Sequence, residues 1–497
     1  MLHRRTLLAT GAAALAPLVL PTGALAQARR KDTLVLGLTL EPTGLDPTAK
    51  AGAEIAEVVL YNVFETLTKI NSDGSVTPLL AESWEVSPDL RTYTFRLRRG
   101  VKFQNGEAFD ANTVKFSFDR AAADKSTNKD KRTFANLSTK VADEHTVVLT
   151  NQEIDPDFLF MMGQATSIVV EPKSATTNAS KPVGTGPYKL AAWAKGASVT
   201  LTAWPGYRSA QSIRIKRAVF RFIPDPAAQV AALLAGDVDA FPRVSPRSVP
   251  QFKANARFQV VVSNSRAKTI LAINNARKPL SDIRVRRAIA AAIDRKAVIA
   301  GAADGYGVPI GSYYVPTAFG YVDTTGVNPF DLEKAKALMA EAGVKTPLTL
   351  TMTLPPAPYA RQGGELIAAQ LAKIGIQLKL QNVEWAQWLA GTYTNKNYDL
   401  TIISHVEPFD LGNFAKPDYY WGYQSQEFNE LFDKIKHTPR PADRARLLGD
   451  AQRLLAHDSV HGFLYTPQWV TVANKKLRGL WKDMPVFVND LSALSWG

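Results

Sequence analysis

The sequence predicts an α/β protein of two domains, one of which is built from both ends of the chain. A strand, a helix and a second strand follow one another within residues 348–380, a pattern typical of parallel strands joined by a crossover helix. Segments with β character lie before this unit and return after residue 461. At about 150 residues a domain, a chain of 497 residues suggests two large units or three smaller ones.

The first part of the chain contains several short runs that alternate apolar and polar residues, which predicts half-buried strands. The first run covers 33–40 and ends in a turn-rich loop at 41–47. Helices are expected at 54–67 and 109–120. Further strands are predicted at 93–97, 147–149, 199–202 and 218–223.

The middle of the chain predicts an α/β domain with a crevice at the carboxyl edge of its sheet. Apolar residues at 285–293 have helical spacing, and Asp331 caps a helix that ends at Gly343. The strand at 348–354, the helix at 366–374 and the strand at 376–380 form the crossover unit, and 398–404 adds a third strand.

The last part returns to β character after a helix at 442–457, with strands at 462–465 and 470–472. We therefore interpret the α/β domain as an insertion in a discontinuous first domain. Two segments should cross between the domains, one near 269–275 and one near 460–465.

The composition excludes several classes of protein. Hydrophobic residues make up 46% and charged residues 21%, which speaks against global disorder. The absence of cysteine excludes disulfides, thiolate zinc sites, iron–sulfur clusters and a cysteine nucleophile. The net charge of +14 predicts a solvated basic surface, because acidic residues interleave most basic clusters and no basic groove with stacked aromatics is evident. We therefore expect no nucleic-acid partner.

Residues 1–26 resemble a signal peptide. His3, Arg4 and Arg5 form its basic start, an apolar stretch follows, and Ala24-Leu-Ala26 is a small-residue cleavage site. The two arginines fit a twin-arginine signal, and an ordinary Sec signal stays open. A lipoprotein anchor is excluded by the missing cysteine, and no later segment has about 18 uninterrupted apolar residues. We expect an exported, soluble, periplasmic protein.

Motifs for catalysis or for metals are weak. The chain has no nucleophile elbow and no Walker motif, so we do not expect an enzyme. The pairs Gly184/Gly186 and Gly305/Gly307 lack the third glycine of a dinucleotide-binding loop, and we interpret them as turn glycines. His457 and His461 have the spacing of a metal pair, but the helix should end between them. We predict no metal and no cofactor.

Aromatic and acidic residues gather near predicted strand ends. Trp385 and Trp388 form one group, and residues 419–421 form another. The aromatic side chains of both groups either pack in the core or contact a ligand. His405, Glu407 and Asp410 follow the strand at 398–404. They receive a cationic ligand group or cap the next segment, and the sequence leaves both interpretations open.

The run Leu80–Phe109, LAESWEVSPDLRTYTFRLRRGVKFQNGEAF, resembles the signature of family 5 extracellular solute-binding proteins, the dipeptide, oligopeptide and nickel receptors of ABC importers. The similarity extends from about residue 33 to about 480. It includes Gly184-Thr-Gly-Pro-Tyr188, Ala232–Asp239, Arg284–Arg295 and Asp331–Gly343.

The resemblance implies the two-lobed periplasmic binding protein fold of type II, similar to cluster C, with two crossover strands as the hinge. It implies a first lobe over 27–270, with an extra subdomain near 70–185. The second lobe would cover 271–462, and 463–497 would return to the first lobe.

The resemblance also implies a monomeric receptor that closes its lobes around a small peptide or peptide-like ligand and delivers it to an ABC permease. The alternatives are a receptor for an opine, another sugar–amino acid conjugate or chelated nickel, and an exported hydrolase.

The implied site combines both lobes. The loop 39–46 corresponds to the cleft loop of the first lobe. A carboxylate after the strand 398–404 would bind the ligand amine, although the family's usual tryptophan and Gly-Asp pattern is missing there. Dipeptide receptors bind the ligand carboxylate with an arginine near the end of the strand 348–354, where this chain has Leu-Pro-Pro. The predicted ligand contacts are Thr39, Glu41, Thr43, Gly44, Arg361, Trp385, His405, Glu407, Asp410, Tyr420 and Trp421, with Arg266 and Thr269 as secondary candidates.

Overall fold

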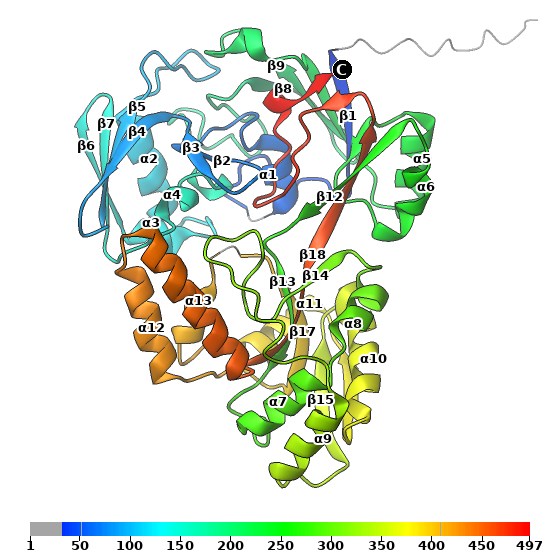
Figure 1. Ribbon diagram of the computed structural model, residues 1–497. Coiled ribbons are helices and arrows are strands. Elements are labelled where there is room, and N and C mark those ends of the chain that lie inside the picture. The colour runs from blue at the N-terminus through cyan, green and yellow to red at the C-terminus, as the bar shows by residue number, and fades with distance from the viewer. Residues whose placement is uncertain (1–31, 51, 408) are drawn as a thin grey trace, which may run out of the picture.

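The computed structural model describes residues 32–50, 52–407 and 409–497, and shows two lobes joined by a narrow connection (Figure 1). The predicted signal peptide lies outside the described residues. Both ends of the described chain lie in the first lobe, where the indole of Trp496 donates to the carbonyl of Thr33 over 3.1 Å. Among the described helices, none is long and apolar enough to cross a membrane.

A single sheet runs through both lobes in the order β16-β15-β17-β13-β18-β11-β1-β10-β9-β8, and β12 and β14 pair with β18 beside this path. The strands of its first-lobe part are β1 (Thr33–Leu38), β8 (Tyr188–Ala194), β9 (Ser198–Ala203), β10 (Arg217–Phe222), β11 (Ala240–Phe241) and β12 (Phe258–Asn264).

The strand β1 is buried on both faces, although its sequence predicts a half-buried strand. Leu34 and Leu36 face one core together with α1 (Ala53–Val59). Val35 faces a second core against α5 (Pro226–Ala235) and α6 (Pro250–Lys253). Parallel pairing with β10 places β1 inside the sheet, where helices cover both sides.

The predicted helix over 54–67 ends earlier, at Val59. Leu60 has an extended backbone and Tyr61 a positive φ of 60°, so the helical hydrogen-bond ladder stops there. The hydroxyl of Tyr61 donates to the carbonyl of Gly163 over 2.7 Å and fixes this turn against the subdomain.

A separate core forms the extra subdomain that the resemblance implied. Its sheet has the order β4-β5-β7-β6, and Phe95, Phe118 and Phe158 fill the space between sheet and helices. Its elements are β4 (Ala81–Val86), β5 (Thr92–Leu97), α2 (Ala111–Ala122), α3 (Lys131–Ala135), β6 (Leu137–Asp143), β7 (Thr146–Asn151) and α4 (Phe158–Met161), beside the hairpin β2 (Thr68–Ile70) and β3 (Val76–Pro78).

The second lobe is a sheet covered by helices on both faces. The predicted parallel pairing is confirmed, because Leu348 of β15 (Leu348–Leu354) is in register with Ile376 of β16 (Ile376–Asn382). β17 (Leu400–His405) is parallel to β15, whereas β13 (Lys268–Ile273) is antiparallel to β17.

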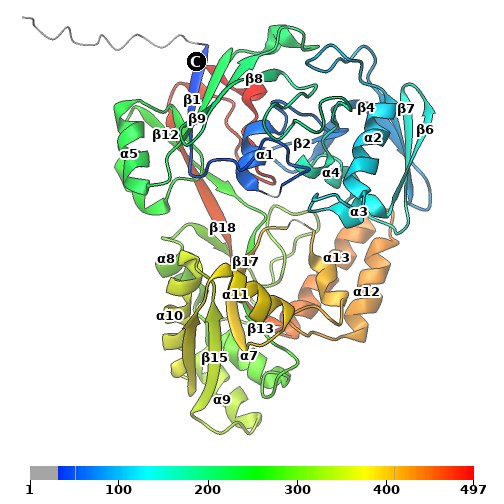
Figure 2. The ribbon, with the colours of Figure 1, turned by 180° about the vertical axis from the view of Figure 1, so that it is seen from behind.

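One face of this sheet carries α7 (Ile283–Ala291), α8 (Arg295–Ala302), α9 (Leu332–Glu341) and α10 (Pro358–Ala372). The other face carries α11 (Trp385–Trp388), which continues into a π-helix over Leu389–Thr394, with α12 (Gln426–Lys436) and α13 (Pro441–His457). Figure 2 shows α12 and α13 below α3 of the subdomain.

The strand β18 (His461–Asn474) connects the lobes. Residues 461–465 pair with β13 in the second lobe, and residues 468–474 pair with β12 in the first. The two strands predicted at 462–465 and 470–472 are therefore one strand. Pro467 lies where β18 changes its partner and faces Gly307 of the short strand β14 (Gly307–Pro309), so both long ladders keep their hydrogen bonds.

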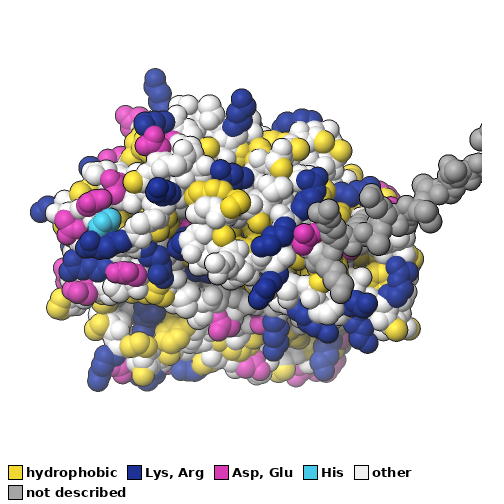
Figure 3. All heavy atoms as spheres, turned by 90° about the horizontal axis from the view of Figure 1, so that it is seen from above, with side chains coloured by type: hydrophobic (Ala, Val, Ile, Leu, Met, Phe, Trp, Pro, Cys, Tyr) yellow, Lys and Arg dark blue, Asp and Glu magenta, His cyan; other side chains and the backbone are white. Residues whose placement is uncertain are grey.

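The chain crosses between the lobes twice, once from β12 to β13 and once within β18. The C-terminal segment forms the short antiparallel pair β19 (Leu477–Arg478) and β20 (Ser495–Trp496). On the face shown in Figure 3, basic and acidic side chains are interspersed, as expected for a solvated surface.

Gly184 and Gly186 were interpreted as turn glycines, but these positions need glycine for another reason. Two backbone segments approach each other there too closely to leave room for a side chain. A Cβ atom on Gly184 would lie 2.0 Å from the carbonyl oxygen of Val63, and one on Gly186 would lie 2.5 Å from that of Asn62. Neither glycine is among the described residues with positive φ. This contact joins the end of the subdomain to the turn after α1.

We predict that Gly184→Ala lowers the free energy of unfolding by about 2 kcal/mol, because backbone atoms cannot move aside for the new methyl group. Gly326→Ala is the matched control, since a Cβ there meets no atom within 4 Å. Urea unfolding followed by fluorescence measures both. Equal midpoints for the two variants would contradict this packing role.

Candidate functional site

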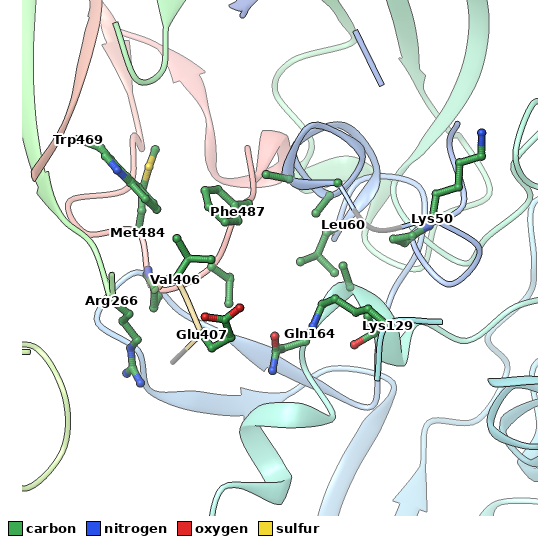
Figure 4. A pocket seen from close by; sticks show the side chains of 18 residues that line it. Lys50, Leu60, Lys129, Gln164, Arg266, Val406, Glu407, Trp469, Met484 and Phe487 are labelled. Atoms are coloured by element: carbon green, nitrogen blue, oxygen red, sulfur yellow. The ribbon is translucent and has the colours of Figure 1, made fainter. Parts of the chain in front are cut away.

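A cavity of 380 Å³ lies between the lobes (Figure 4). The first lobe contributes the segment before α1, α1 itself and the segment 484–487, and the subdomain contributes residues 129 and 164–166. The crossings contribute Arg266 and Trp469, and the second lobe contributes Val406 and Glu407. A solute in this cavity would therefore contact both lobes at once.

The first-lobe side of the cavity has an aromatic wall. The rings of Trp469 and Phe487 stack at 5.0 Å between centroids and 25° between planes. The guanidinium of Arg243 lies 5.8 Å and 5.1 Å from these two rings and forms an ion pair of 2.6 Å with Glu57. These contacts hold the wall in place, and its apolar face suits a planar or aliphatic group.

The second-lobe side of the cavity is polar. The carboxylate of Glu407 points into the cavity near Gln164 (Figure 4), and 61% of its side chain is exposed. His405, whose Nδ1 lies 3.7 Å from this carboxylate, lowers the pKa of Glu407 to about 2, against the opposing effect of burial. Glu407 is therefore ionised at neutral pH and can accept hydrogen bonds from a ligand.

Asp410 lies behind Glu407 and already has strong partners. Lys268 Nζ lies 2.5 Å from Oδ1, and the hydroxyl of Tyr313 donates to Oδ2 over 2.6 Å. The side chains of Lys268 and Asp410 are 3% and 7% exposed. Burial and the charge of Asp410 raise the pKa of Tyr313 well above its usual value, so the hydroxyl stays a donor.

An aromatic cluster supports the loop that carries these groups. His405 Nε2 lies 2.9 Å from the hydroxyl of Tyr420, and the ring of Trp421 stacks on Phe414 at 4.5 Å. Tyr420 and Trp421 are almost fully buried. They belong to the core beneath the site, and in this arrangement they position His405.

Arg266 lies between the lobes at the start of a crossing. Its guanidinium lies 4.9 Å from the ring of Phe160 in the subdomain and 5.4 Å from that of Phe409 in the second lobe. The two rings are in edge contact at 4.8 Å. Burial lowers the pKa of Arg266, and its Nε has no hydrogen-bond partner among the described residues. Arg266 thus connects both lobes through two aromatic faces.

The other predicted site residues lie elsewhere. Glu41 accepts hydrogen bonds from the indole of Trp193 (2.9 Å) and the amide of Gly196 (3.0 Å), so it fixes the β8–β9 hairpin. Thr39, Thr43 and Gly44 belong to the same loop and do not line the cavity, whereas Pro47 and Lys50 further along do. Arg361 is 3.5 Å from Glu384 on the surface, and Trp385 is 43% exposed.

His405, Glu407 and Asp410, which follow one strand, lie together, and Tyr420 and Trp421 from the separate aromatic group pack against His405. The His405, Glu407 and Asp410 ligand atoms lie within 4.8 Å of one another, a spacing that a metal could use. The ammonium of Lys268 already neutralises Asp410, so a divalent cation would meet a buried positive charge, and we assign no metal to this group. His457 ends α13 and His461 begins β18, and they do not form a pair.

Several important residues were missed by sequence reasoning. Lys268 had a usable signal, because a lysine in the apolar run Lys268–Ile273 needs a buried partner. Tyr313, Phe160 and Trp469 had none, since each lies far in sequence from the groups it contacts.

Two lobes, a double crossing and a cavity lined from both sides define a two-lobed binding protein that encloses a solute. The model of bacterial extracellular solute-binding proteins, family 5 (middle), matches residues 75–435, and the chain belongs to this family.

The chain is 30% identical over 477 residues to the dipeptide-binding protein of Escherichia coli K12, covering 86% of this chain and 87% of that one. It is similar to the solved structure of the periplasmic binding protein AgaA of A. tumefaciens in complex with agropinic acid, with 27% identity, a TM-score of 0.77 and coverage of 94% and 99%. HbpA2 of Haemophilus parasuis, with 23% identity, a TM-score of 0.84 and coverage of 94% and 100%, confirms the fold.

A second contact between the lobes involves acidic groups. Arg444 of α13 donates to the carbonyl of Pro156 in the subdomain over 3.2 Å. Burial raises the pKa of the neighbouring Asp157 to about 7, and the charge of Asp155 adds to this effect, whereas Arg444 and Arg266 oppose it. Tyr314 also faces Asp157, and Asp157 raises the pKa of its hydroxyl further.

We predict that Asp157→Asn stabilises the protein by about 1 kcal/mol at pH 8, and that this stabilisation decreases as the pH falls from 7 towards the ordinary pKa of an aspartate. Because Asp157 loses its proton at a higher pH in the folded protein than in the unfolded chain, the folded protein loses stability as the pH rises from about 4 to about 7, and the loss is complete above pH 7. The difference in melting temperature between variant and wild type measures this. A difference independent of pH would contradict it. Asp119→Asn, at an exposed helix position, is the control.

Proposed function

We propose that this protein is the periplasmic substrate-binding protein of an ABC transporter and captures a peptide or peptide-like solute by closing its lobes. The observation that carries the proposal is the cavity lined by both lobes beside two adjacent crossings. Family membership supports it.

The mechanism follows from where the contacts lie. A solute bound to one lobe gains half of the contacts, and closure adds the rest, so binding lowers the free energy of the closed state relative to the open one. The crossings permit this motion because the ladder changes partner at 465–468, which leaves a short segment to absorb the rotation. The closed surface would then dock on a membrane permease.

In this proposal the receptor acts as a monomer and leaves its ligand chemically unchanged. The cavity offers a carboxylate, Glu407, an amide, Gln164, and an aromatic wall. Such groups hold a small amphipathic solute with hydrogen bonds and apolar contact.

A ligand other than a free peptide is the second candidate. The observation in its favour is the ion pair of Lys268 with Asp410, which occupies one of the two carboxylates near the cavity. The relative AgaA, solved with agropinic acid, supports the same candidate.

We predict that protein purified without added ligand carries a small solute, which native mass spectrometry detects as a noncovalent mass increment. Returning the solute to stripped protein should raise the melting temperature by several degrees, because it binds only the folded state. The solute should be recovered unchanged. Its conversion to a product would instead support the exported hydrolase.

We predict that Glu407→Ala weakens binding of this solute about tenfold, through loss of a charge-assisted hydrogen bond. Glu384→Ala is the matched control, because that exposed carboxylate pairs with Arg361 away from the cavity. Calorimetry measures both affinities. Equal affinity of Glu407→Ala and wild type would remove Glu407 from the site.

A further inference from the structure

Two carboxylates lie at the polar end of the cavity, and their surroundings differ. Glu407 and Asp410 both follow β17, and their oxygen atoms lie within 4.8 Å of a His405 nitrogen. Glu407 lines the cavity, whereas Asp410 is 9% exposed and lies behind it. The charge of the ligand group that can bind at the polar end of the cavity depends on which of these two carboxylates is free to contact the ligand.

Lys268 supplies an ammonium group from the protein's own chain to Asp410. Its Nζ lies 2.5 Å from the carboxylate, donates to the backbone carbonyl of Glu407, and lies 4.8 Å from the ring of Tyr313. A carboxylate, a carbonyl and an aromatic face are the partners that proteins provide for a bound amine. Tyr313 occupies the second carboxylate oxygen. Asp410 therefore already has a cation and a hydroxyl donor.

We propose that Lys268 takes the place of a ligand's amino group, and that the cavity therefore selects peptide-like solutes whose nitrogen at this end is acylated and uncharged. This inference rests on the proposed function and names its substrate class. A ligand ammonium would find Asp410 occupied and would meet the like charge of Lys268, which costs binding free energy at a poorly solvated site.

The rest of the cavity fits such a solute. The ionised carboxylate of Glu407 can accept the N–H of an amide, and the charge of Lys268 offsets part of its attraction for a cation. The aromatic wall of Trp469 and Phe487 can receive an acyl group or an apolar side chain. The volume of 380 Å³ is near the lower end of the range of about 300–1,000 Å³ for small-molecule sites, which suits a ligand of two residues.

Calorimetry with L-alanyl-L-phenylalanine and its N-acetyl form tests the proposal on the wild-type protein. We expect the acetylated dipeptide to bind at least about tenfold more tightly than the free one. Equal or tighter binding of the free dipeptide overturns the proposal. This comparison requires no variant and so does not depend on any variant folding.

Lys268→Met removes the ammonium and keeps most of the apolar stem, so Asp410 becomes free for a ligand amine. The preference should then reverse in favour of the free dipeptide by at least about tenfold. The double variant Lys268→Met, Asp410→Asn should lose this reversal. Lys416→Met is the control, because Lys416 bonds to Asn413 and does not line the cavity. A Lys268→Met protein with the wild-type preference contradicts the assignment.

Ethylammonium chloride tests the Asp410 site without any peptide. It should raise the melting temperature of Lys268→Ala, compared with sodium chloride at equal concentration, and leave wild type unchanged. A rise in wild type, or none in the variant, overturns the role of Lys268. If ethylammonium raises the melting temperature of Lys268→Ala but neither dipeptide binds the wild-type protein, the peptide ligand of the proposed function is refuted. The assignment of Lys268 would still hold.

Discussion

The structure depends on one strand that belongs to two lobes. β18 is hydrogen-bonded to β13 at one end and to β12 at the other, so its backbone must stay extended through the connection. The chain also crosses between the lobes next to β18, from β12 to β13. The lobes therefore cannot separate without breaking the pairing of β18 with β12 and with β13. They can rotate where the partners change, since both long ladders end there and residues 466–467 pair only with the short strand β14. Trp469 lies next to this point and forms one wall of the cavity, so rotation of the lobes and the shape of the cavity are coupled directly.

The polar end of the cavity shows how burial sets the chemistry of identical groups. Glu407 and Asp410 are both carboxylates after β17, but Asp410 is nearly buried and must be neutralised, whereas Glu407 remains open to the cavity. A buried carboxylate without partners is costly, and Lys268 and Tyr313 supply the ammonium and the hydroxyl donor that Asp410 contacts. The same pair fixes the loop after β17 against β13, which positions the Glu407 carboxylate. Of these two acidic residues three positions apart, Asp410 therefore has its contacts within the protein and Glu407 faces the cavity.

Local patterns predicted much of the fold, and distant contacts explain the rest. The alternation in 348–354 and 376–380 and the glycine at 375 were sufficient for the crossover unit, because these signals lie within the unit itself. The end of α1 was not predictable, since a hydrogen bond from Tyr61 to Gly163, about a hundred residues away, holds the turn. For the site, the carboxylates after β17 were found from strand position, but their different roles depend on Lys268 and Tyr313, which reach them from other elements. The loop at 39–46 was predicted to face the cleft, but Glu41 bonds to the β8–β9 hairpin, and the cavity is lined further along the chain by Pro47 and Lys50.

The contacts between the lobes limit what a ligand has to contribute. Arg266 with Phe160 and Phe409, and Arg444 with the carbonyl of Pro156, join the lobes through protein groups alone. Because these contacts involve no solute, they contribute the same free energy whichever solute is bound, and so they do not improve discrimination. Discrimination must come from groups that face the solute, which are the aromatic wall and the polar end. In the proposed role of Lys268, the charge of the polar end is fixed from within the protein, so selectivity would depend on a residue of a buried strand that no bound solute needs to touch.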